Sequence, residues 1–385
     1  MKILFISHDA SRTGAPMVFL HLLNWLKANT EIEIFILLQR GGNLVGEFSK
    51  VSETKVWFRS TKKRKLSFKD EIKRSVKNWL VDEKSHQNSI KKWVDSNKID
   101  LIYSNSAASS EVLVALDPKV PVIQHIHELE TTINTYCSPE NFKQTHQFTS
   151  KYVAVSEIVK NNLILNHNVD DNNLRIINEF VPEPIVHISA SEMKKQLGFD
   201  ENTLIVGGSG TLCWRKGTDL FLQVAKKTPD TINGRPVKFL WIGGKLNAQA
   251  HQEYLHDIKH LGLENKVVIT GLVTNPGDYF NVLDLFLMTS REDPFPLVCI
   301  EAGYLKKPVI CFEGVVGSTD FVTEETGGVV PYADIDHMAE KTQSILDNEH
   351  LRFQKGNSIF THVSRDYNLD KLAQKCLNLI QEVII

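Results

Sequence analysis

Cysteine is scarce and scattered in this chain of 385 residues. No pair of cysteines forms Cys-x-x-Cys or a metal-ligand pattern, and the five are Cys137, Cys213, Cys299, Cys311 and Cys376. This usage predicts buried thiols in a reducing compartment and no cysteine metal site. No apolar run approaches the ~20 residues of a membrane span, and the run at residues 1–7 is too short for a signal peptide. We therefore expect a cytoplasmic protein.

Several recognition patterns are also missing. The net charge is only −2, which does not favour nucleic-acid binding. The chain has no Gly-x-x-x-x-Gly-Lys-Ser/Thr phosphate loop, and the turn after its first apolar run lacks the Gly-x-Gly-x-x-Gly of dinucleotide dehydrogenases. With 42% apolar and 23% charged residues, the composition is that of an ordinary globular protein. Its length predicts two domains of about 150–200 residues each.

Short apolar runs alternate with segments of helical period along the whole chain. Many of these runs are continuously apolar, as expected of strands buried on both faces of a parallel sheet. The predicted strands are 2–6, 31–38, 54–58, 100–103, 121–126, 151–155, 174–178, 203–209, 237–242, 266–270, 284–289, 308–312 and 328–330. Their alternation with helices predicts an α/β fold with two doubly wound, Rossmann-like sheets.

The domain boundary is predicted within 180–200, where Val181-Pro-Glu-Pro184 breaks regular structure and a short helix at 190–197 follows. We expect an N-terminal domain at 1–185 and a C-terminal domain at 186–365. A last helical segment at 366–385 would then cross back to the first domain. Ligands of such sheets lie beyond the carboxyl ends of the strands, which places them in a central cleft between two facing sheets.

The most informative segment is Ser290-Arg-Glu-Asp-Pro-Phe-Pro-Leu-Val-Cys-Ile-Glu301, which joins a predicted strand to an amphipathic helix. The amino end of a helix presents free N–H groups and partial positive charge, and proline is tolerated in its first turn. The amides of Leu297 and Val298 are therefore predicted to face a phosphate. Phe295 and Asp293 would lie nearer a sugar.

Two acids bracket this loop and can accept hydrogen bonds from hydroxyl groups. Glu301 falls one helical turn beyond the amides that face the phosphate, where it can take a vicinal diol such as ribose. The pattern suggests a ligand that is both sugar and phosphate. The alternative is purely structural, with Asp293 capping the helix and Glu301 paired with a surface lysine.

A second segment, Gly207-Gly-Ser-Gly210-Thr-Leu-Cys-Trp-Arg215-Lys216-Gly217, carries a strand into a glycine-rich turn. Glycines such as Gly210 let the backbone approach a ligand closely. Arg215 offers a planar fork and Lys216 a point charge, so the pair can neutralise a diphosphate. The alternative is a simple turn whose two cations face solvent.

The first loop, His8 to Met17, leads from the first strand to a helix predicted at 15–28. Gly14 permits close backbone approach, the helix end can receive an anion, and Arg12 can reach a phosphate or an acceptor. A tight connection with Pro16 in the first turn of the helix is the structural alternative.

Two motifs raise the question of a metal site. Strand alternation places His125 and His127 on the same side, but no third ligand of suitable spacing accompanies them. They are more readily hydrogen-bonding site residues or structural histidines. Asp334-Ile-Asp336 resembles an Asp-x-Asp metal motif, but we expect it to cap a helix at 335–348. No metal site is therefore predicted.

A basic region at 55–92 holds 13 Lys/Arg and 4 Asp/Glu, with aromatic residues between them. Such a surface can hold anionic lipid or a lipid-diphosphate acceptor, at ~1 kcal/mol per basic residue near a membrane. This would place the protein at the inner face of the membrane. The alternative is a solvated charged face.

Taken together and in this order, the motifs resemble a GT-B glycosyltransferase of family 4, the large retaining group related to sucrose and mannosyl transferases. The residues that carry the resemblance are Arg215-Lys216-Gly217, Thr270-Gly271 and 290–302, supported by Gly14-Ala15, His127, Val155-Ser156-Glu157 and Ile176-Ile-Asn178. The second half of the chain matches best.

The resemblance implies transfer of a hexose-type sugar from a nucleoside-diphosphate donor to a glycan or lipid-linked acceptor, in the synthesis of surface polysaccharide or glycolipid. The anomeric configuration would be retained, without an essential metal or other cofactor. The C-terminal domain would bind the nucleotide sugar and the N-terminal domain would lie on the acceptor side.

The resemblance also implies roles for individual residues. Arg215 and Lys216 would stabilise the departing diphosphate, and Asp293 would hold hydroxyls of the donor sugar. Glu301 would bind the donor ribose, and His127 would touch the donor sugar or the acceptor. Further donor contacts are predicted, from the motifs or from the resemblance, at Gly14, Ala15, Gly210, Gly271, Leu272, Phe295, Leu297 and Val298.

The chain departs from the family pattern at three places. Asp293 stands where the family usually has glutamate, which is one methylene longer. Pro294-Phe295-Pro296 replaces Gly-Phe-Gly and removes two backbone donors. Thr211 stands where an arginine often precedes the lysine by five residues, and Arg215 is the candidate substitute.

Two other functions fit the same fold. A nucleotide-sugar epimerase would turn over the donor without an acceptor, but it needs a proton-transfer group beside the sugar, and we identify none. A non-catalytic nucleotide-sugar-binding protein would bind the donor and show neither transfer nor slow hydrolysis.

Overall fold

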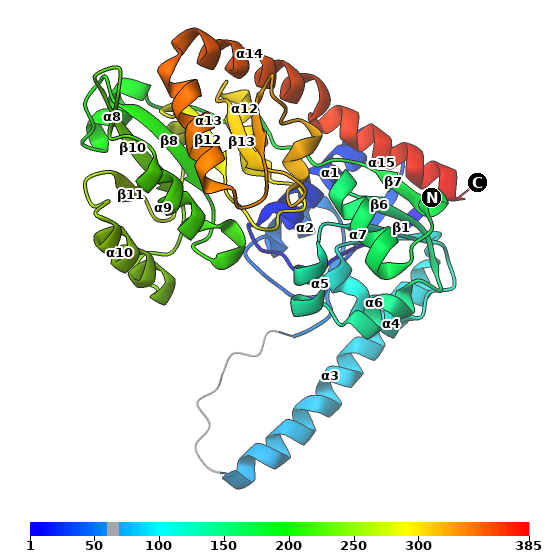
Figure 1. Cartoon of the computed structure of the whole chain (residues 1–385). Helices are drawn as coiled ribbons and strands as arrows, with labels where there is room; N and C mark the ends of the chain where they lie inside the picture. The colour runs from blue at the N-terminus through cyan, green and yellow to red at the C-terminus, as the bar shows by residue number, and fades with distance from the viewer. Residues whose placement is uncertain (60–68, 385) are drawn as a thin grey trace. The chain divides into compact units, whose positions relative to one another are not determined.

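A computed structural model describes the backbone of residues 1–59 and 69–384 and the side chains of 1–59 and 82–384. The chain forms two compact units (Figure 1). Unit 1 comprises residues 1–155, 159–177 and 369–385, and unit 2 comprises 156–158 and 178–368. The last helix, α15 (Leu369–Ile384), thus belongs to the unit that begins the chain.

Unit 1 is built on a seven-stranded parallel sheet with the order β3-β2-β1-β4-β5-β6-β7. The strands are β1 (Lys2–Ser7), β2 (Glu33–Leu38), β3 (Thr54–Val56), β4 (Leu101–Asn105), β5 (Val122–Ile126), β6 (Thr149–Ala154) and β7 (Leu174–Ile176). All residues of β4, and all residues of β1 from Ile3 onward, are buried, because helices cover both faces of the sheet. The predicted parallel, doubly wound arrangement is confirmed.

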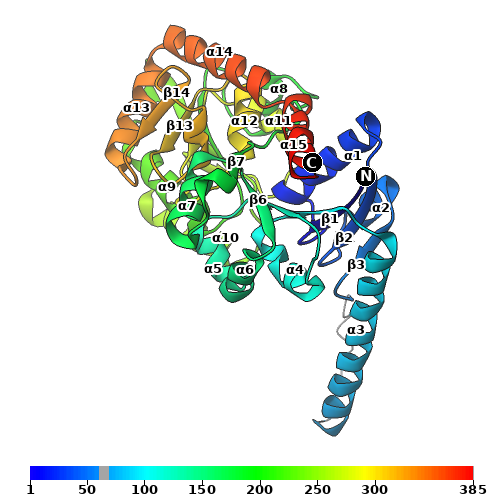
Figure 2. The same cartoon turned by 90° about the vertical axis from the view of Figure 1, so that its right-hand side faces the viewer.

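Helices connect the strands of unit 1. They are α1 (Gly14–Asn29), α2 (Val45–Val51), α3 (Lys69–Asn97), α4 (Ser110–Leu116), α5 (Glu130–Tyr136), α6 (Pro139–Thr145) and α7 (Glu157–His167), with short 3-10 turns η1 (Ala107–Ser109) and η2 (Asp171–Asn173). Helix α3 joins the core at its carboxyl end, where Ile90 is buried and Trp93 packs against the same cluster. Figures 1 and 2 show that the opposite end of α3 runs away from the sheet.

Helix α15 closes unit 1 by packing against α1. One face of α15 buries Leu372, Ala373, Cys376, Leu379 and Ile380. The indole N–H of Trp25, on α1, donates to Asp370 at 2.7 Å, and Arg175, on β7, binds Glu382 at 3.0 Å. Helix α15 therefore belongs to the same hydrophobic core as α1.

Unit 2 repeats the architecture with the strand order β11-β10-β8-β12-β13-β14. The parallel strands are β8 (Leu204–Ser209), β10 (Arg235–Ile242), β11 (Val267–Ile269), β12 (Leu285–Met288), β13 (Val309–Phe312) and β14 (Gly327–Val330). Each lies within two residues of a predicted strand at its boundaries. The sequence did not predict β9 (Thr231–Ile232), a two-residue antiparallel addition to β10.

The helices of unit 2 are α8 (Ala190–Gln196), α9 (Thr218–Lys227), α10 (Gln249–Leu261), α11 (Pro276–Asn281), α12 (Leu297–Tyr304), α13 (Ile335–Asp347) and α14 (Glu349–Asp366), with 3-10 turns η3 (Trp214–Lys216) and η4 (Gly317–Asp320). Asp334 caps α13 as predicted, because its carboxylate accepts the N–H of His337 at 3.0 Å. All five cysteines are free thiols, and all but Cys213 are buried.

Candidate functional site

The turn after β8 brings Arg215 and Lys216 to the carboxyl edge of the unit 2 sheet. The short 3-10 turn η3 carries both residues, and Gly217 ends it with φ of +64°. A Cβ on Gly217 would lie 1.9 Å from the carbonyl oxygen of Thr289, at the end of β12. Glycine is therefore required here both by the backbone conformation and by the close approach of the neighbouring strand.

Lys216 and Asp293 form the central contact of the site. The ammonium of Lys216 lies 2.5 Å from the Asp293 carboxylate, and an Arg215 guanidinium nitrogen lies 3.6 Å from the same oxygen. Arg215 also donates to the carbonyl of Glu292 at 2.9 Å. Asp293 is buried. The two cations therefore do not simply face solvent, since both turn toward one buried acid.

A second ion pair ties the two loops together, and sequence reasoning missed it. The guanidinium of Arg291 binds both carboxylate oxygens of Asp219, at 2.8 and 2.6 Å, and lies over the ring of Trp214. The backbone N–H of Arg291 donates to the carbonyl of Arg215 at 2.8 Å. These contacts join residues about seventy positions apart, so no local sequence pattern predicts them.

Helix α12 begins where the sequence predicted a phosphate-facing helix end. Pro296 occupies the N-cap position, and no described side chain caps the helix there. Asp293 therefore does not cap α12, which removes that alternative. Leu297 and Val298 supply the first amides of the helix. The Phe295 ring is buried against Phe321 and Tyr367, which anchors the loop.

Glu301 follows on α12 without a basic partner. Among the described residues, none forms a hydrogen bond or ion pair with its carboxylate, so the predicted surface-lysine alternative is not found. Burial raises the pKa of Glu301 to about 7. A buried carboxylate without a partner among the described residues can accept hydrogen bonds from a ligand.

Glycines from three turns meet beside Lys216. Gly210, Gly243 and Gly271 all have positive φ, and a Cβ on Gly243 would lie 2.8 Å from the carbonyl of Gly210. A Cβ on Gly210 would lie 3.1 Å from the Lys216 side chain. Leu272, next to Gly271, is 82% exposed. The missing side chains let these turns and the Lys216 side chain pack closely together, at the edge where ligands of parallel sheets bind.

Residues just before and at the start of α7, which belong to unit 2, support the Pro294 loop. Ser156 donates to the carbonyl of Pro294 at 2.6 Å. The Glu157 N–H and the Asn178 amide reach the carboxylate of Asp320 at 3.4 and 3.2 Å. Burial raises the pKa of Asp320 to about 6. These contacts give a structural reason for the Ser156-Glu157 and Asn178 motifs.

The remaining predicted residues lie in unit 1. Gly14 and Ala15 begin α1, whose N-cap residue Thr13 makes no side-chain cap. Arg12 is exposed and binds Glu47 at 3.0 Å. The loop thus leaves the first amides of α1 uncapped by a described side chain, as a ligand-binding turn requires.

His125 and His127 do lie side by side, with ring centroids 4.3 Å apart. Burial, and secondarily His127, lowers the pKa of His125 well below its usual value, which favours the neutral ring. His125 contacts the hydroxyl of Tyr103 at 2.8 Å, and His127 contacts the Asn105 amide oxygen at 2.7 Å. Within the described residues, no group of three His, Cys, Asp or Glu is placed to hold a metal ion.

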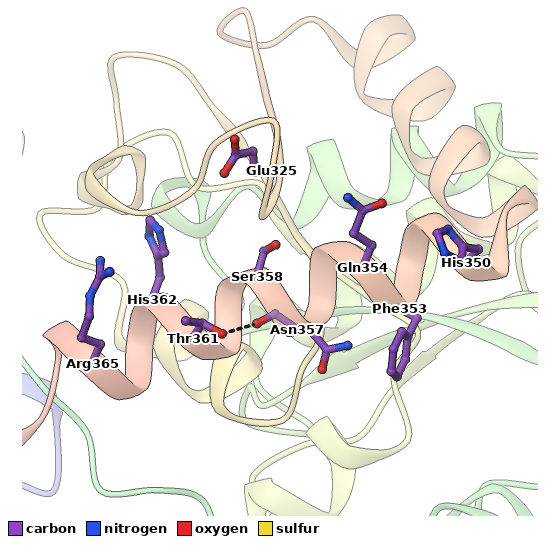
Figure 3. Close-up of a pocket in the computed structure, with 9 residues that line it drawn as sticks. All are labelled: Glu325, His350, Phe353, Gln354, Asn357, Ser358, Thr361, His362 and Arg365. Carbon is purple, nitrogen blue, oxygen red and sulfur yellow. Dashed lines mark hydrogen bonds between the residues drawn. The ribbon is translucent and has the colours of Figure 1, made fainter.

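A separate hollow runs along α14 in unit 2. Figure 3 shows polar side chains of this helix along the hollow, together with Glu325 from a neighbouring loop. Phe353 is the exposed apolar residue of the lining. The lining contains none of the residues predicted for sugar or phosphate binding.

The fold, with two Rossmann-like domains of parallel sheet, is that of the GT-B class. Residues 189–358, all in unit 2, match the family described as Glycosyl transferases group 1. A similar protein is the poly(ribitol-phosphate) alpha-N-acetylglucosaminyltransferase of Staphylococcus aureus, 26% identical over 62% of this chain and 48% of its own length. Another is the lipopolysaccharide core mannosyltransferase LpsB of Rhizobium meliloti, 29% identical over 41% of this chain and 46% of its own length. The chain thus spans about half the length of these curated relatives.

Solved structures resemble the whole chain. HepE of Anabaena, in complex with UDP and glucose, has a TM-score of 0.79 at 18% identity and covers 99% of this chain and 100% of its own. The predicted GT-B fold is confirmed by this likeness. Together the matches support a group 1 glycosyltransferase. No helix among the described residues has the length and apolar character needed to cross a bilayer.

Proposed function

We propose that this protein is a retaining glycosyltransferase that moves a hexose-type sugar from a nucleoside-diphosphate donor to a glycan or lipid-linked acceptor. The proposed setting is surface polysaccharide or glycolipid synthesis, because similar proteins are named for lipopolysaccharide core and capsular polysaccharide biosynthesis. The observation that carries the proposal is the pairing of Arg215 and Lys216 with Asp293, beside the amino end of α12. The structure of HepE, a protein of similar fold, has been solved in complex with UDP-glucose.

The donor diphosphate would bind the two cations and the helix amides. Arg215 and Lys216 supply positive charge, while the N–H groups of Leu297 and Val298 supply donors at the positive end of the α12 dipole. Glu301 would accept hydrogen bonds from the ribose diol. Asp293 would accept them from the sugar.

Other groups would contribute through their backbone or from unit 1. Gly210 lets the Lys216 side chain pack against its backbone. Gly271 and Leu272 would line the base pocket, and the Phe295 N–H would face the sugar. Gly14 and Ala15 would contribute the amides of α1, and His127 would contact the sugar or the acceptor.

The chemistry follows from the leaving group. Cleavage of the anomeric C–O bond moves negative charge onto the diphosphate while the sugar becomes oxocarbenium-like. Fixed cations and helix amides stabilise that charge most strongly in the transition state. The departing phosphate oxygen can accept the proton of the acceptor hydroxyl on the same face, which gives retention without a protein nucleophile. Because Arg215 and Lys216 supply the charge, no metal is needed in this scheme.

A panel of nucleotide sugars tested by thermal shift, followed by a hydrolysis assay on the hits, tests this proposal. The expected result is a specific donor that stabilises the protein and is slowly hydrolysed without an acceptor. Conversion of the donor sugar to an epimer would favour the epimerase alternative. Donor binding without transfer or hydrolysis would favour a binding protein. Retention of the anomeric configuration can be read from the product by NMR.

We also propose a cytoplasmic location at the inner face of the membrane, through the basic region 55–92. Lys62, Lys63, Arg64 and Lys65 of this region lie outside the described residues. Replacing these four with glutamine is expected to reduce sedimentation with anionic liposomes at low salt, since each basic residue contributes about 1 kcal/mol near the surface. Binding that is unchanged by the replacements would instead indicate a solvated charged face.

A further inference from the structure

We propose that a polar hollow in unit 1 binds a phosphate-bearing, polyhydroxylated part of the acceptor. This inference rests on the transferase function proposed above and names the acceptor's chemical class. Residues lining the hollow include His8, Gln39, Arg40, Glu128, Tyr136 and Cys137. All of them belong to unit 1.

The hollow lies where a doubly wound sheet is expected to bind its ligand. His8 follows β1, Gln39 and Arg40 follow β2, and Glu128 follows β5, so the lining comes from the carboxyl ends of the strands. Strand β1 stands between β2 and β4, which is the point where the strand order reverses direction. Ligands of open parallel sheets bind in the crevice at this switch point.

Two buried polar atoms of the lining lack a partner. Gln39 is only 6% exposed, yet its side-chain oxygen accepts no hydrogen bond from any described residue. Nδ1 of His8 is likewise buried and unpaired within the described part of the chain. A buried acceptor without a donor is unfavourable, so a ligand hydroxyl that donates to Gln39 would satisfy it.

Arg40 adds a positive charge to the lining. A ligand with hydroxyl groups alone would leave that charge unmatched. Its exposed guanidinium forms no hydrogen bond or ion pair with any described residue. In contrast, Arg12, Arg59 and Arg175, the other arginines of unit 1 with described side chains, bind Glu47, Asp82 and Glu382. A free guanidinium at the mouth of a polar hollow matches the geometry of a phosphate group.

The acids of the lining are already engaged. The Glu128 carboxylate accepts hydrogen bonds from the Ser106 hydroxyl and from the N–H groups of Ala107 and His127. The Asp9 carboxylate accepts the N–H and hydroxyl of Ser11. These oxygens are therefore committed to holding loops together, and Arg40 remains available for an external anion.

The two kinds of group together define the ligand class. A neutral glycan would leave Arg40 without a matching charge, and inorganic phosphate lacks carbon-bound hydroxyl groups that could donate to Gln39 while the phosphate binds Arg40. A polyol or sugar phosphate ester satisfies both. The ester could be free or carried on a lipid headgroup.

Calorimetry on the full chain with glycerol 1-phosphate, glycerol and inorganic phosphate tests the inference. The wild-type protein is expected to bind glycerol 1-phosphate more tightly than either of the other two. Arg40→Ala should weaken that binding by about tenfold or more, because a charged hydrogen bond is lost. Lys119→Ala, which removes an exposed cation of unit 1 already paired with Asp117, should leave it unchanged.

Gln39→Met provides a second test, because methionine has a similar volume and no acceptor oxygen. This variant should lose the preference for glycerol 1-phosphate over inorganic phosphate, with its thermal unfolding confirming that it is folded. Equal affinity of the wild type for phosphate and its ester, or equal binding by the Arg40 and Lys119 variants, would overturn the inference.

Vesicles distinguish the two sources of the ester. Binding to phosphatidylglycerol vesicles but not to phosphatidylcholine vesicles, lost in Arg40→Ala, supports a lipid-borne acceptor. Binding of the soluble ester alone supports a free one. A protein that binds glycerol 1-phosphate at Arg40 but neither binds nor hydrolyses any nucleotide sugar would retain this site and disprove the transferase proposal instead.

Discussion

Single residues of the candidate site neutralise and orient one another. Asp293 holds the ammonium of Lys216 at 2.5 Å, with Arg215 close by, so the three groups carry a net charge of about +1. Because Asp293 is buried, the direction of the lysine is set before any ligand arrives. Such preorganised charge stabilises a developing anion without the cost of rearrangement.

Lys216→Ala is expected to slow donor turnover by about 10²-fold or more, as for other lost transition-state donors. The measurement is the rate of sugar transfer, or of donor hydrolysis, at saturating donor. Lys227→Ala is the matched control, because this lysine is partly exposed and pairs with Asp336. Near-normal turnover in the Lys216 variant would rule out its role at the diphosphate.

Glu301 predicts a pH dependence of donor binding. Its pKa is raised to about 7 by burial, and the ionised form accepts both hydrogen bonds of a diol. Affinity should therefore rise as the pH increases through about 7, by about tenfold between pH 6 and pH 8, as the ionised fraction increases. Calorimetry with a nucleotide sugar is suitable, because its diphosphate does not titrate there.

The control for this experiment is Glu301→Gln, which cannot ionise. It should bind the donor more weakly than the wild type above pH 7 and should show a flat pH profile. A wild-type profile that is also flat would contradict the contact between Glu301 and ribose.

At the scale of elements, a turn and a helix end do most to shape the site. The 3-10 turn η3 ends at Gly217, which lies directly against the end of β12. The α12 amino end begins after Pro296, whose missing N–H costs nothing at that position. Both elements lie at the carboxyl edge of one sheet.

Gly217→Ala is expected to destabilise unit 2 by several kcal/mol, roughly 1–2 for the left-handed backbone and more for the collision with Thr289. Gly234→Ala separates the two effects, since Gly234 also has positive φ, +72°, but its Cβ would meet nothing within 4 Å. Denaturant unfolding should therefore show only the backbone cost of about 1–2 kcal/mol for Gly234→Ala. If both variants lost the same unfolding free energy, the backbone would have shifted to avoid the contact with Thr289, and the predicted collision would be wrong.

Elements were predicted well where their cause is local. The continuously apolar strands of both sheets and the cap of α13 by Asp334 follow from periodicity and from short-range hydrogen bonding. Strand β9 was missed because two residues carry no periodic signal, and only pairing with β10 makes them a strand. The ion pair between Arg291 and Asp219 was not predicted either, because it joins residues 72 positions apart and no local pattern indicates it.

At the scale of the whole molecule, the chain is discontinuous in its units. Unit 1 needs the last helix, α15, to cover α1, although 191 residues of unit 2 separate α15 from the rest of unit 1. Folding of unit 1 therefore depends on a segment that follows unit 2 along the chain. The contacts of Trp25 with Asp370 and of Arg175 with Glu382 hold α15 in register.

Ile380→Ala should weaken unit 1 selectively. Ile380 is fully buried on α15, and such truncations cost about 2–5 kcal/mol. Hydrogen exchange should accelerate in β1 to β7 and stay unchanged in β8 to β14. Ile384→Ala, at the exposed end of the same helix, is the control and should cost little. Equal acceleration in both sheets would show that the units unfold together.

The sequence by itself determined the α/β class, the positions of most strands along the chain, and the segments that carry the candidate site. These depend on residue periodicity, on glycine and proline at turns, and on caps, all of which act within a few positions of the chain. Only the tertiary structure decided that Lys216 pairs with Asp293 across 77 positions and that Glu301 has no described partner. It also decided that Arg40 lines a hollow without an ion pair to any described residue. Contacts of that kind depend on where the crossovers between strands place distant residues, and no local pattern contains that information.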